Sequence, residues 1–416
     1  MADLKEYVRG CAGAAKRASV SLRGLSAETK NRAILAMARS IDESRGEVKD
    51  ANARDVARGK DAGLPPAFLD RLTLTDRRMD EMIGSLREIA AFEDPVGEVI
   101  GVRRPSGFVL EKVRTPIGVI AMIYESRPNV TVDAAALCLK SGNAVILRGG
   151  SEAVESSAAL VRLVRKGLAA AGVDGEAVQY IERTEHEAID ELVSQSGLVD
   201  LVIPRGGESL IRRVAQKATI PVLKHYKGVC HLYVDETADL AMAAEVVTNS
   251  KVQRPGTCNA LEKLLVHQAV AERFLPMVRE KMPNVELRGD AKSLAILPGI
   301  AAAREEDWYA EYLDLILTVK VVDGLEEAAA HIEKYGSSHT DGILSRDAAA
   351  IERFVGMVDS AVVTVNASTR LNDGGIFGLG AEIGISTDKL HARGPMGLKE
   401  LTTYKWILRG NGDIRK

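Results

Sequence analysis

One cysteine, Cys258, stands in the setting that nucleophilic chemistry requires. It lies in the segment QRPGTCNA, residues 253–260, where Arg254, Pro255 and Gly256 break regular structure. A cation four residues before the thiol favours the thiolate, which is the reactive form. A thiolate at a turn can face a cleft and capture an acyl group covalently. The alternative is that Cys258, like most free cysteines, is a small buried hydrophobe.

The other three cysteines lack such a setting. Cys138 lies in an apolar helical run and is predicted to be core, Cys11 lies on an N-terminal helix, and Cys230 lies in a strand-like run over 229–234. No two cysteines have the spacing of zinc ligands or of a redox motif, so we expect no metal. Four cysteines in 416 residues, without a signal peptide, predict a reducing, cytoplasmic location.

Two glycine pairs predict anion-binding turns. They are Arg148-Gly149-Gly150-Ser151 and Arg205-Gly206-Gly207, each at a change from a strand pattern to a helix pattern. Free backbone N–H groups and the helix dipole favour anions at such junctions. Tight turns alone would also explain the glycines. Two arginine-bearing junctions in succession favour a phosphate-bearing cofactor.

The segment ESRPN, residues 125–129, follows an expected strand over 118–124. A role as the cap of the following helix would be enough to explain an asparagine at position 129. Its amide could also donate a hydrogen bond to an oxyanion that develops beside a reactive thiol. The residues alone leave both roles open.

The elements that must position these groups follow from periodicity. Residues 1–92 predict helices, one capped by Ser26 and another over 76–91. Short β runs over 97–124 predict an antiparallel excursion, interrupted at 105–107 and 115–116, that ends in the buried strand 118–124. Strands and helices then alternate, which predicts parallel sheets with crossover helices. The expected strands are 145–147, 178–181 and 198–203, followed after residue 230 by 261–266, 315–322, 341–344 and 361–365.

The chain therefore divides into two parallel-sheet α/β domains and a small β arm. We expect a cofactor-binding domain with N-terminal helices over residues 1–96 and 117–229, and a catalytic domain over 230–397. The arm comprises 97–116 and 398–416, because the β-like tail 402–408 could pair with 97–115 in the same chain or in a neighbour. An unpaired strand edge is a template for another chain, so we expect the arm to mediate homo-oligomerisation.

Composition argues against two classes of partner. A net charge of −3 and a pI near 6.2 give no electrostatic footprint for nucleic acid. No segment approaches the roughly 18 apolar residues of a membrane span. Hydrophobic residues make up 46% of the chain and aromatic residues only 4%, so the cores must be built from Ala, Val, Leu and Ile.

Six long motifs stand out along the chain: SRPNVT (126–131), LKSGN through RGG (139–150), QRPGTCN (253–259), HIEKYGSSHTD (331–341), NASTR (366–370) and GLGAEIG (378–384). They resemble those of the gamma-glutamyl phosphate reductases of the aldehyde dehydrogenase superfamily. The resemblance spans nearly the whole chain, and Ala329, where a larger aliphatic residue is usual, is a minor departure. It implies an aldehyde-dehydrogenase-like α/β fold and the NADPH-dependent reduction of gamma-glutamyl phosphate to glutamate 5-semialdehyde, with release of phosphate, in proline biosynthesis.

The resemblance also implies roles by position. Cys258 matches the nucleophile, Asn129 the oxyanion-hole amide, and Glu311 the carboxylate that holds a cofactor ribose. Ser151 falls where relatives selective for NAD tend to carry a glutamate, which favours NADP. Arg148 would then face the 2′-phosphate, and we expect the adjacent Glu152 to point elsewhere once the helix begins.

The substrate side is predicted from charge. Ordinary aldehyde dehydrogenases carry a glutamate, the base for thioester hydrolysis, where this chain has KHYKG at 224–228. The missing carboxylate fits a reductase that keeps water from its thioester. A substrate with a carboxylate and a phosphoryl group needs cations, and Arg127, Arg254 and Arg370 are our candidates, although each could form a structural ion pair instead. His225 could be structural or could contact phosphate or substrate.

Two other functions stay open at this point. A coenzyme-A-acylating aldehyde dehydrogenase would also dispense with the hydrolytic base. A non-catalytic cofactor-binding scaffold would carry a vestigial site, although the intact Cys258 turn argues against it. Glutamate 5-kinase, which would supply the acyl phosphate, is a candidate partner, although no sequence feature points to a docking site for it.

Overall fold

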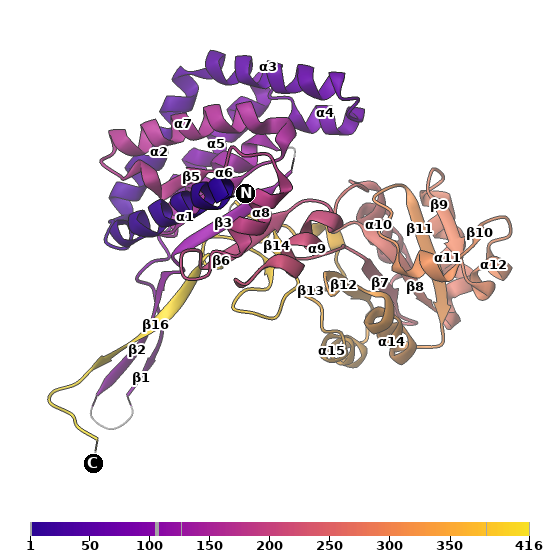
Figure 1. Ribbon diagram of the computed structural model, residues 1–416. Helices are drawn as coiled ribbons and strands as arrows, with labels where there is room; N and C mark the ends of the chain where they lie inside the picture. Colours follow the sequence, from indigo (N-terminus) through magenta and orange to yellow (C-terminus); the bar gives the residue numbers. More distant parts are fainter. Residues whose placement is uncertain (1, 105–107, 126, 380, 416) are drawn as a thin grey trace.

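Two α/β bodies and a protruding β arm make up the structure, a computed structural model that describes residues 2–104, 108–125, 127–379 and 381–415 (Figure 1). The interruption expected at 105–107 lies outside the described residues, as do positions 126 and 380 of the quoted motifs. No helix in the described ranges is both long enough and apolar enough to cross a membrane.

The N-terminal helices belong to the first body, the first packing directly against its sheet and the others outside the helices that cover it. Ser26 caps the second of them as expected, because its hydroxyl accepts a hydrogen bond from the N–H of Thr29 at 3.2 Å. This helix packs closely against α7 (Val154–Ala170), where a Cβ on Gly167 would lie 2.5 Å from the backbone of Met37. The helices are α1 (Ala2–Leu22), α2 (Ala27–Glu43), α3 (Arg45–Asp61), α4 (Pro66–Leu72) and α5 (Asp76–Ala91).

A four-stranded parallel sheet forms the centre of this body, in the order β5 (Val178–Tyr180), β4 (Ala144–Arg148), β3 (Val119–Tyr124), β6 (Leu201–Arg205). Complete burial of β3 and β4 explains their apolar sequences. The chain moves from β3 to β4 and β5, then returns to the other side of β3. The carboxyl ends of β3 and β6 therefore form a topological switch point, where open α/β sheets bind ligands. The associated helices are α6 (Pro128–Lys140), α7, α8 (His186–Val193) and α9 (Glu208–Lys217).

The second body is built on a seven-stranded parallel sheet. Alternate residues of β7 point to opposite faces of the sheet. Leu232 and Val234 belong to the hydrophobic core on one face and Tyr233 to the core on the other. The strand order is β10 (Ala301–Ala302), β9 (Glu286–Gly289), β11 (Ile316–Val322), β8 (Leu261–His267), β7 (Cys230–Val234), β12 (Thr340–Leu344), β13 (Val362–Val365). The helices are α10 (Leu240–Val252), α11 (Gln268–Lys281), α12 (Ala291–Ile296), α13 (Glu305–Tyr309), α14 (Leu325–Tyr335) and α15 (Ala348–Met357).

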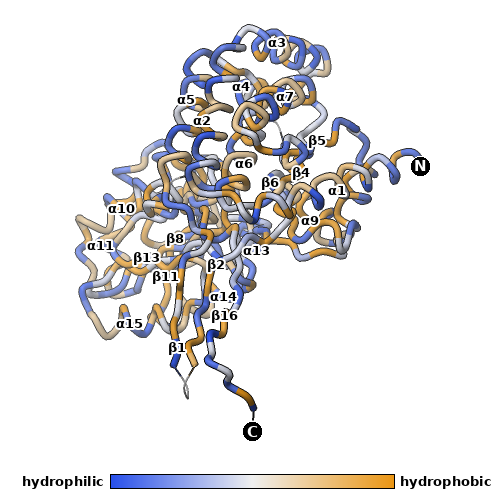
Figure 2. Tube along the Cα trace, turned by 90° about the vertical axis from the view of Figure 1, so that its left-hand side faces the viewer, coloured by the Kyte–Doolittle hydropathy of each residue, from blue (hydrophilic) through white to orange (hydrophobic). Residues whose placement is uncertain are grey.

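The arm is a three-stranded antiparallel sheet of β1 (Val99–Arg103), β2 (Val109–Pro116) and β16 (Thr402–Arg409). The tail pairs with β2 of the same chain, from Thr402 opposite Pro116 to Arg409 opposite Val109. The interruption expected at 115–116 lies at 117–118 instead, because β2 continues to Pro116 and β3 begins at Val119. Figure 2 shows apolar stretches along these strands, far from both cores.

One segment lies on a different body from the one predicted. Ile383, Ala392 and Met396 pack into the hydrophobic core of the first body, and the short strands β14 (Ile385–Ser386) and β15 (Gly394–Pro395) lie between them. The range 230–397 predicted for the catalytic domain includes this segment. The other domain boundaries stay predictions.

Candidate active site

Cys258 lies in the loop between α10 and β8, at the amino end of the second sheet. Its side chain is half-buried, whereas Cys138 is buried, as its apolar surroundings predict, and Cys230 on its strand is buried as well. A Cβ on Gly228 would lie 1.7 Å from the carbonyl oxygen of Cys258. Only glycine fits there, so the loop 224–228 lies directly against the cysteine loop and brings His225 beside the thiol.

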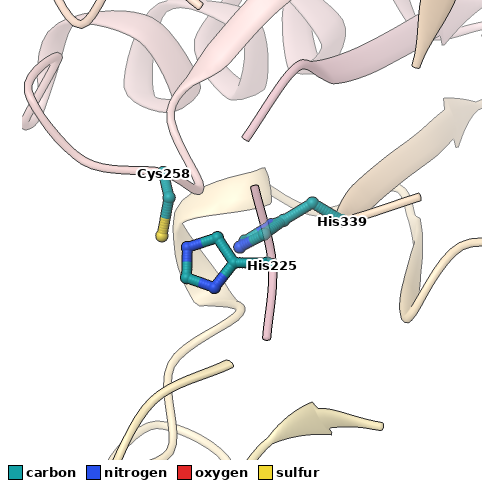
Figure 3. A group of neighbouring side chains, drawn as sticks. All are labelled: His225, Cys258 and His339. Atoms are coloured by element: carbon teal, nitrogen blue, oxygen red, sulfur yellow. The ribbon is translucent and has the colours of Figure 1, made fainter. Parts of the chain in front are cut away.

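Two imidazoles converge on this thiol (Figure 3). Donor atoms of Cys258, His225 and His339 all lie within 4.8 Å of one another, and the two rings meet edge to face with centroids 5.3 Å apart. Nδ1 of His225 lies 2.8 Å from the backbone oxygen of Ile385. Because a carbonyl only accepts, Nδ1 carries the proton and Nε2 keeps the lone pair. His339 received no role from the sequence, although it lies in the motif HIEKYGSSHTD.

His339 is fully buried. Its Nδ1 lies 2.8 Å from the hydroxyl of Thr340, and its Nε2 has no hydrogen-bond partner among the described residues. Burial lowers the pKa of His339 to about 4, against the opposing effect of the carboxylates of Glu311, Asp341 and Glu382. The imidazole is therefore neutral at pH 7.

Three arginines lie close enough to the thiol, or to one another, to interact electrostatically. Loss of solvation, followed by repulsion from neighbouring arginines that include Arg254, lowers the pKa of Arg127, while Cys258 acts in the opposite direction. The pKa of Arg370 is lowered in the same way, by burial first and then by Arg254, and Cys258 again opposes the shift. Arg127 and Arg370 therefore both interact with Cys258 and with Arg254, which makes the site strongly cationic.

Arg370 also holds the cysteine loop in place. Its Nε donates to Oε1 of Gln253 at 2.8 Å, and another guanidinium nitrogen donates to Oδ1 of Asn259. Nδ2 of Asn259 in turn donates to the carbonyl of Asn372 at 2.9 Å. These bonds tie residues on both sides of the cysteine to one guanidinium, and a substrate contact by Arg370 stays a prediction.

Asn129 does not cap the next helix. Helix α6 begins at Pro128 with Arg127 at the N-cap position and no side-chain cap. The amide of Asn129 instead donates to Oδ2 of Asp133 at 3.3 Å, one turn along the helix. Burial raises the pKa of Asp133 to about 6. Within the described ranges no hydrogen bond links Asn129 to Cys258, and an oxyanion role for the second N–H of this amide stays a prediction.

A cleft of about 1010 Å³ opens at the carboxyl ends of the first sheet. Both predicted anion-binding turns reach it, since Arg148, Gly150 and Ser151 line it after β4 and Gly207 lines it after β6. Its volume is that of a cofactor site. Arg205 and Gly206 directly precede Gly207, and Gly149 packs on Tyr124, which also lines the cleft.

Arg148 is a buried part of this cleft, with only 6% of its surface exposed. It donates hydrogen bonds to the carbonyls of Gly149 at 2.9 Å and Thr184 at 2.8 Å. The expectation that Glu152 points elsewhere is wrong. Glu152 lines the same cleft, and its carboxylate lies 2.2 Å from the position of a Cβ on Gly150.

Glu125 occupies the second anion-binding turn itself and was not assigned from the sequence. Its Oε2 accepts a hydrogen bond from the N–H of Gly207 at 2.9 Å, and a Cβ on Gly206 would lie 2.6 Å from its carboxyl carbon. An internal carboxylate thus sits at the amino end of α9, where a phosphate would bind. A carboxylate directly after a buried strand was the signal available in the sequence.

Glu311 lies where the two bodies meet. Its Oε1 accepts a hydrogen bond from the N–H of Gly228 at 2.9 Å, and burial raises its pKa. Beside it, Lys227 and Glu208 form an ion pair at 3.3 Å that joins the loop 224–228 to the start of α9. The carboxyl ends of the first sheet therefore face the amino ends of the second. A contact between Glu311 and a cofactor ribose stays a prediction.

Known proteins resemble this chain over its full length. Residues 2–315 match the aldehyde dehydrogenase family. Gamma-glutamyl phosphate reductase of Thermodesulfovibrio yellowstonii is 52% identical over 417 residues, with 100% of both chains covered. That of Geotalea daltonii is 52% identical over 99% of both chains. The crystal structure of gamma-glutamyl phosphate reductase from Thermotoga maritima shares a TM-score of 0.97 and 46% identity, over 98% of this chain and 100% of that one.

Sequence and fold thus agree, and they confirm both the resemblance and the fold class predicted from the motifs. The chain belongs to the aldehyde dehydrogenase family and, within it, to the gamma-glutamyl phosphate reductases.

Proposed function

We propose that the protein reduces gamma-glutamyl phosphate to glutamate 5-semialdehyde with release of phosphate, in proline biosynthesis, with NADPH as reductant. The observation that carries the proposal is a half-buried thiol, Cys258, on a loop that the guanidinium of Arg370 holds on both sides, with Arg127 close enough to act on the thiol electrostatically. A phosphoryl group and an α-carboxylate together need such a cationic pocket. The names of the full-length relatives support the same substrate.

The first step of the mechanism is acyl transfer to Cys258. The thiolate attacks the acyl carbonyl, a C–S bond forms, and the C–O bond to phosphate breaks with its electron pair going to the departing phosphate. His225 is placed to take the thiol proton, because its Nε2 keeps a lone pair. Arg127 and Arg254 offset the charge of the leaving phosphate, and Asn129 donates to the oxyanion through the N–H that does not meet Asp133.

The cleft of the first body fits a nicotinamide dinucleotide. Backbone N–H groups at Gly206 and Gly207 suit the diphosphate, Arg148 and Ser151 the 2′-phosphate end, and Glu311 a ribose. When bound, NADPH supplies the hydride that converts the thioester to the aldehyde and frees the thiolate. The segment KHYKG (224–228) offers no carboxylate to activate water, so the thioester persists until it is reduced.

The test is turnover of Cys258→Ser beside Cys11→Ser, a matched control at a half-buried thiol on α1. Activity is measured in reverse, from glutamate 5-semialdehyde, phosphate and NADP⁺. Cys258→Ser should lose essentially all activity, because a serine hydroxyl is far less ionised than a thiol. More than a few per cent of wild-type turnover would rule out the thioester.

Exchanging phosphate for coenzyme A in the same assay separates the alternatives. Wild-type turnover that requires phosphate supports the proposal. Turnover only with coenzyme A would show an acylating aldehyde dehydrogenase, and turnover with neither would leave a cofactor-binding scaffold.

A further inference from the structure

The group of Cys258, His225 and His339 has the composition of a soft-metal site. One sulfur and two imidazole nitrogens lie within 4.8 Å of one another. Zn²⁺ binds sulfur at about 2.3 Å and nitrogen at about 2.0–2.1 Å, so the donor atoms need to approach by roughly 1 Å to share one ion. We infer that these three residues bind a soft divalent cation such as Zn²⁺, which masks the nucleophile.

The orientation of both imidazoles supports this site. Metal-bound histidines usually donate their other N–H to a carbonyl or carboxylate, and Nδ1 of His225 meets the carbonyl of Ile385 in this way at 2.8 Å. His339 is fully buried, with an Nε2 that has no partner in the described part of the chain. An unpaired buried nitrogen is costly, and coordination to a cation would satisfy it.

Charges around the site set the strength of binding. The positive charges of Arg127, Arg254 and Arg370 repel a dication. The carboxylates of Glu311 and Glu382, which act electrostatically on His339, attract it. Three protein ligands leave the fourth position of a tetrahedral ion open. Because the nucleophile is itself a ligand, cation binding and thioester formation exclude each other.

The fold, rather than local spacing, brings these ligands together. They come from the segments that precede β7, β8 and β12, three neighbouring strands in the second sheet. Cysteine spacing, on which the expectation of no metal depends, carries no information on such a set. The inference does not require the proposed reaction, since the same groups would bind the cation in a protein with any activity.

Cobalt titration tests the site directly. Addition of Co²⁺ to metal-free, reduced protein should produce a sulfur-to-cobalt charge-transfer band that saturates at one ion per chain and disappears when Zn²⁺ is added. Cys11→Ser should keep the band and Cys258→Ser should lose it. His225→Gln and His339→Gln should each weaken binding at least about tenfold, since even an outer-shell partner is worth 10–100-fold in affinity. No band in the wild type, or full affinity in either histidine variant, would overturn the inference.

A second measurement needs no variant at the site. Iodoacetamide labelling of the wild type, read by peptide mass spectrometry, reports the reactivity of each thiol separately. Zn²⁺ should slow alkylation of Cys258 and leave that of Cys11 unchanged. Equal rates with and without Zn²⁺ at Cys258 would overturn the inference even where a histidine variant fails to fold.

Discussion

The guanidinium of Arg148 serves the protein and its expected ligand at once. Two carbonyls hold it in the wall of the cleft, while its Nε has no partner among the described residues. Glu152 lies close enough to act on it electrostatically. We therefore expect any preference for a 2′-phosphate to depend on the balance between one buried cation and one nearby carboxylate.

Substitution of these two residues should move cofactor choice in opposite directions. Arg148→Met should raise the Michaelis constant for NADPH by roughly ten- to a hundredfold, because a charged hydrogen bond contributes about 1.5–3 kcal/mol, and should change that for NADH little. Glu152→Gln should lower the constant for NADPH. Steady-state kinetics with both cofactors, beside a thermal melt of each variant, decide this. Equal effects on NADPH and NADH would contradict the assignment.

The burial of His331 leads to a prediction of how the stability of the fold depends on pH. Both of its ring nitrogens lack partners in the described ranges, and burial, then His231 and nearby lysines, lowers its pKa to about 2. The unfolded chain titrates near 6.5. Below that pH the unfolded state binds a proton that the folded state refuses, so the free energy of unfolding falls by up to about 1.4 kcal/mol per pH unit.

The variant His331→Phe should lose less stability on acidification than the wild type. Phenylalanine keeps an aromatic ring among Trp308 and Tyr335 and leaves no polar atom unpaired. Denaturant unfolding at pH 7 and pH 5 measures how much free energy of unfolding each protein loses on acidification. The variant should lose about 2 kcal/mol less than the wild type. Equal losses in both proteins would show that His331 does not titrate this way.

Single residues differ in how far the sequence reveals them. Cys258 could be singled out because its cue is local, a turn next to a cation. His339 could not, because its partner Cys258 lies far away in sequence, and the position of Glu125 after a buried strand does not show that its carboxylate reaches Gly207. Asn129 shows a second limit, since the sequence places it at the start of α6 but does not show that its amide meets Asp133.

At the scale of elements, long apolar strands were predictable and short ones were not. The strand β3 has a continuous apolar sequence, and β4 is apolar up to Arg148, because both strands are buried on both faces. By contrast, β9 spans Glu286–Gly289 and β10 only Ala301–Ala302, too short for periodicity to reveal them. The packing of 383–396 on the first body depends on tertiary contact alone.

The amino end of α9 offers a prediction at this scale. Its dipole and free N–H groups attract the carboxylate of Glu125 and would attract a diphosphate equally. Glu125→Gln keeps the size of the side chain and removes the competing charge. Affinity for NADPH, measured by calorimetry, should rise about three- to tenfold, which corresponds to about 0.7–1.4 kcal/mol at a helix end.

Glu208→Gln is the matched control for this change. Glu208 also lies in the first turn of α9, but it is paired with Arg212 and Lys227. The control should not tighten binding. Weaker binding by Glu125→Gln would show that Glu125 holds the cofactor instead of competing with it.

At the scale of the whole molecule, the site exists only because two sheets face each other in opposite senses. The carboxyl ends of β4 and β6 present the two predicted anion-binding turns, and the amino ends of β7, β8 and β12 present the thiol and its imidazoles. The ion pair between Lys227 and Glu208 joins the two. Parallel alternation predicts both sheets, but their mutual orientation is set by packing between the bodies.

The arm leads to the remaining prediction. Tyr404, Trp406 and Leu408 alternate along β16 and therefore share one face, with 48%, 48% and 59% of their surfaces exposed. The outer edges of β1 and β16 carry no strand in the described part of the sheet. An exposed apolar face beside open strand edges favours association with a second copy.

We therefore expect a dimer or larger assembly that depends on this face. Trp406→Glu combined with Leu408→Glu should reduce the mass measured by light scattering to that of one chain at micromolar concentration, because two charges would be buried without partners. Lys405→Glu, on the opposite face of the same strand, should leave the assembly intact. A monomeric wild type would contradict the prediction. Dissociation by Lys405→Glu as well would instead show that charge anywhere on the arm, and not burial of this face, disrupts the assembly.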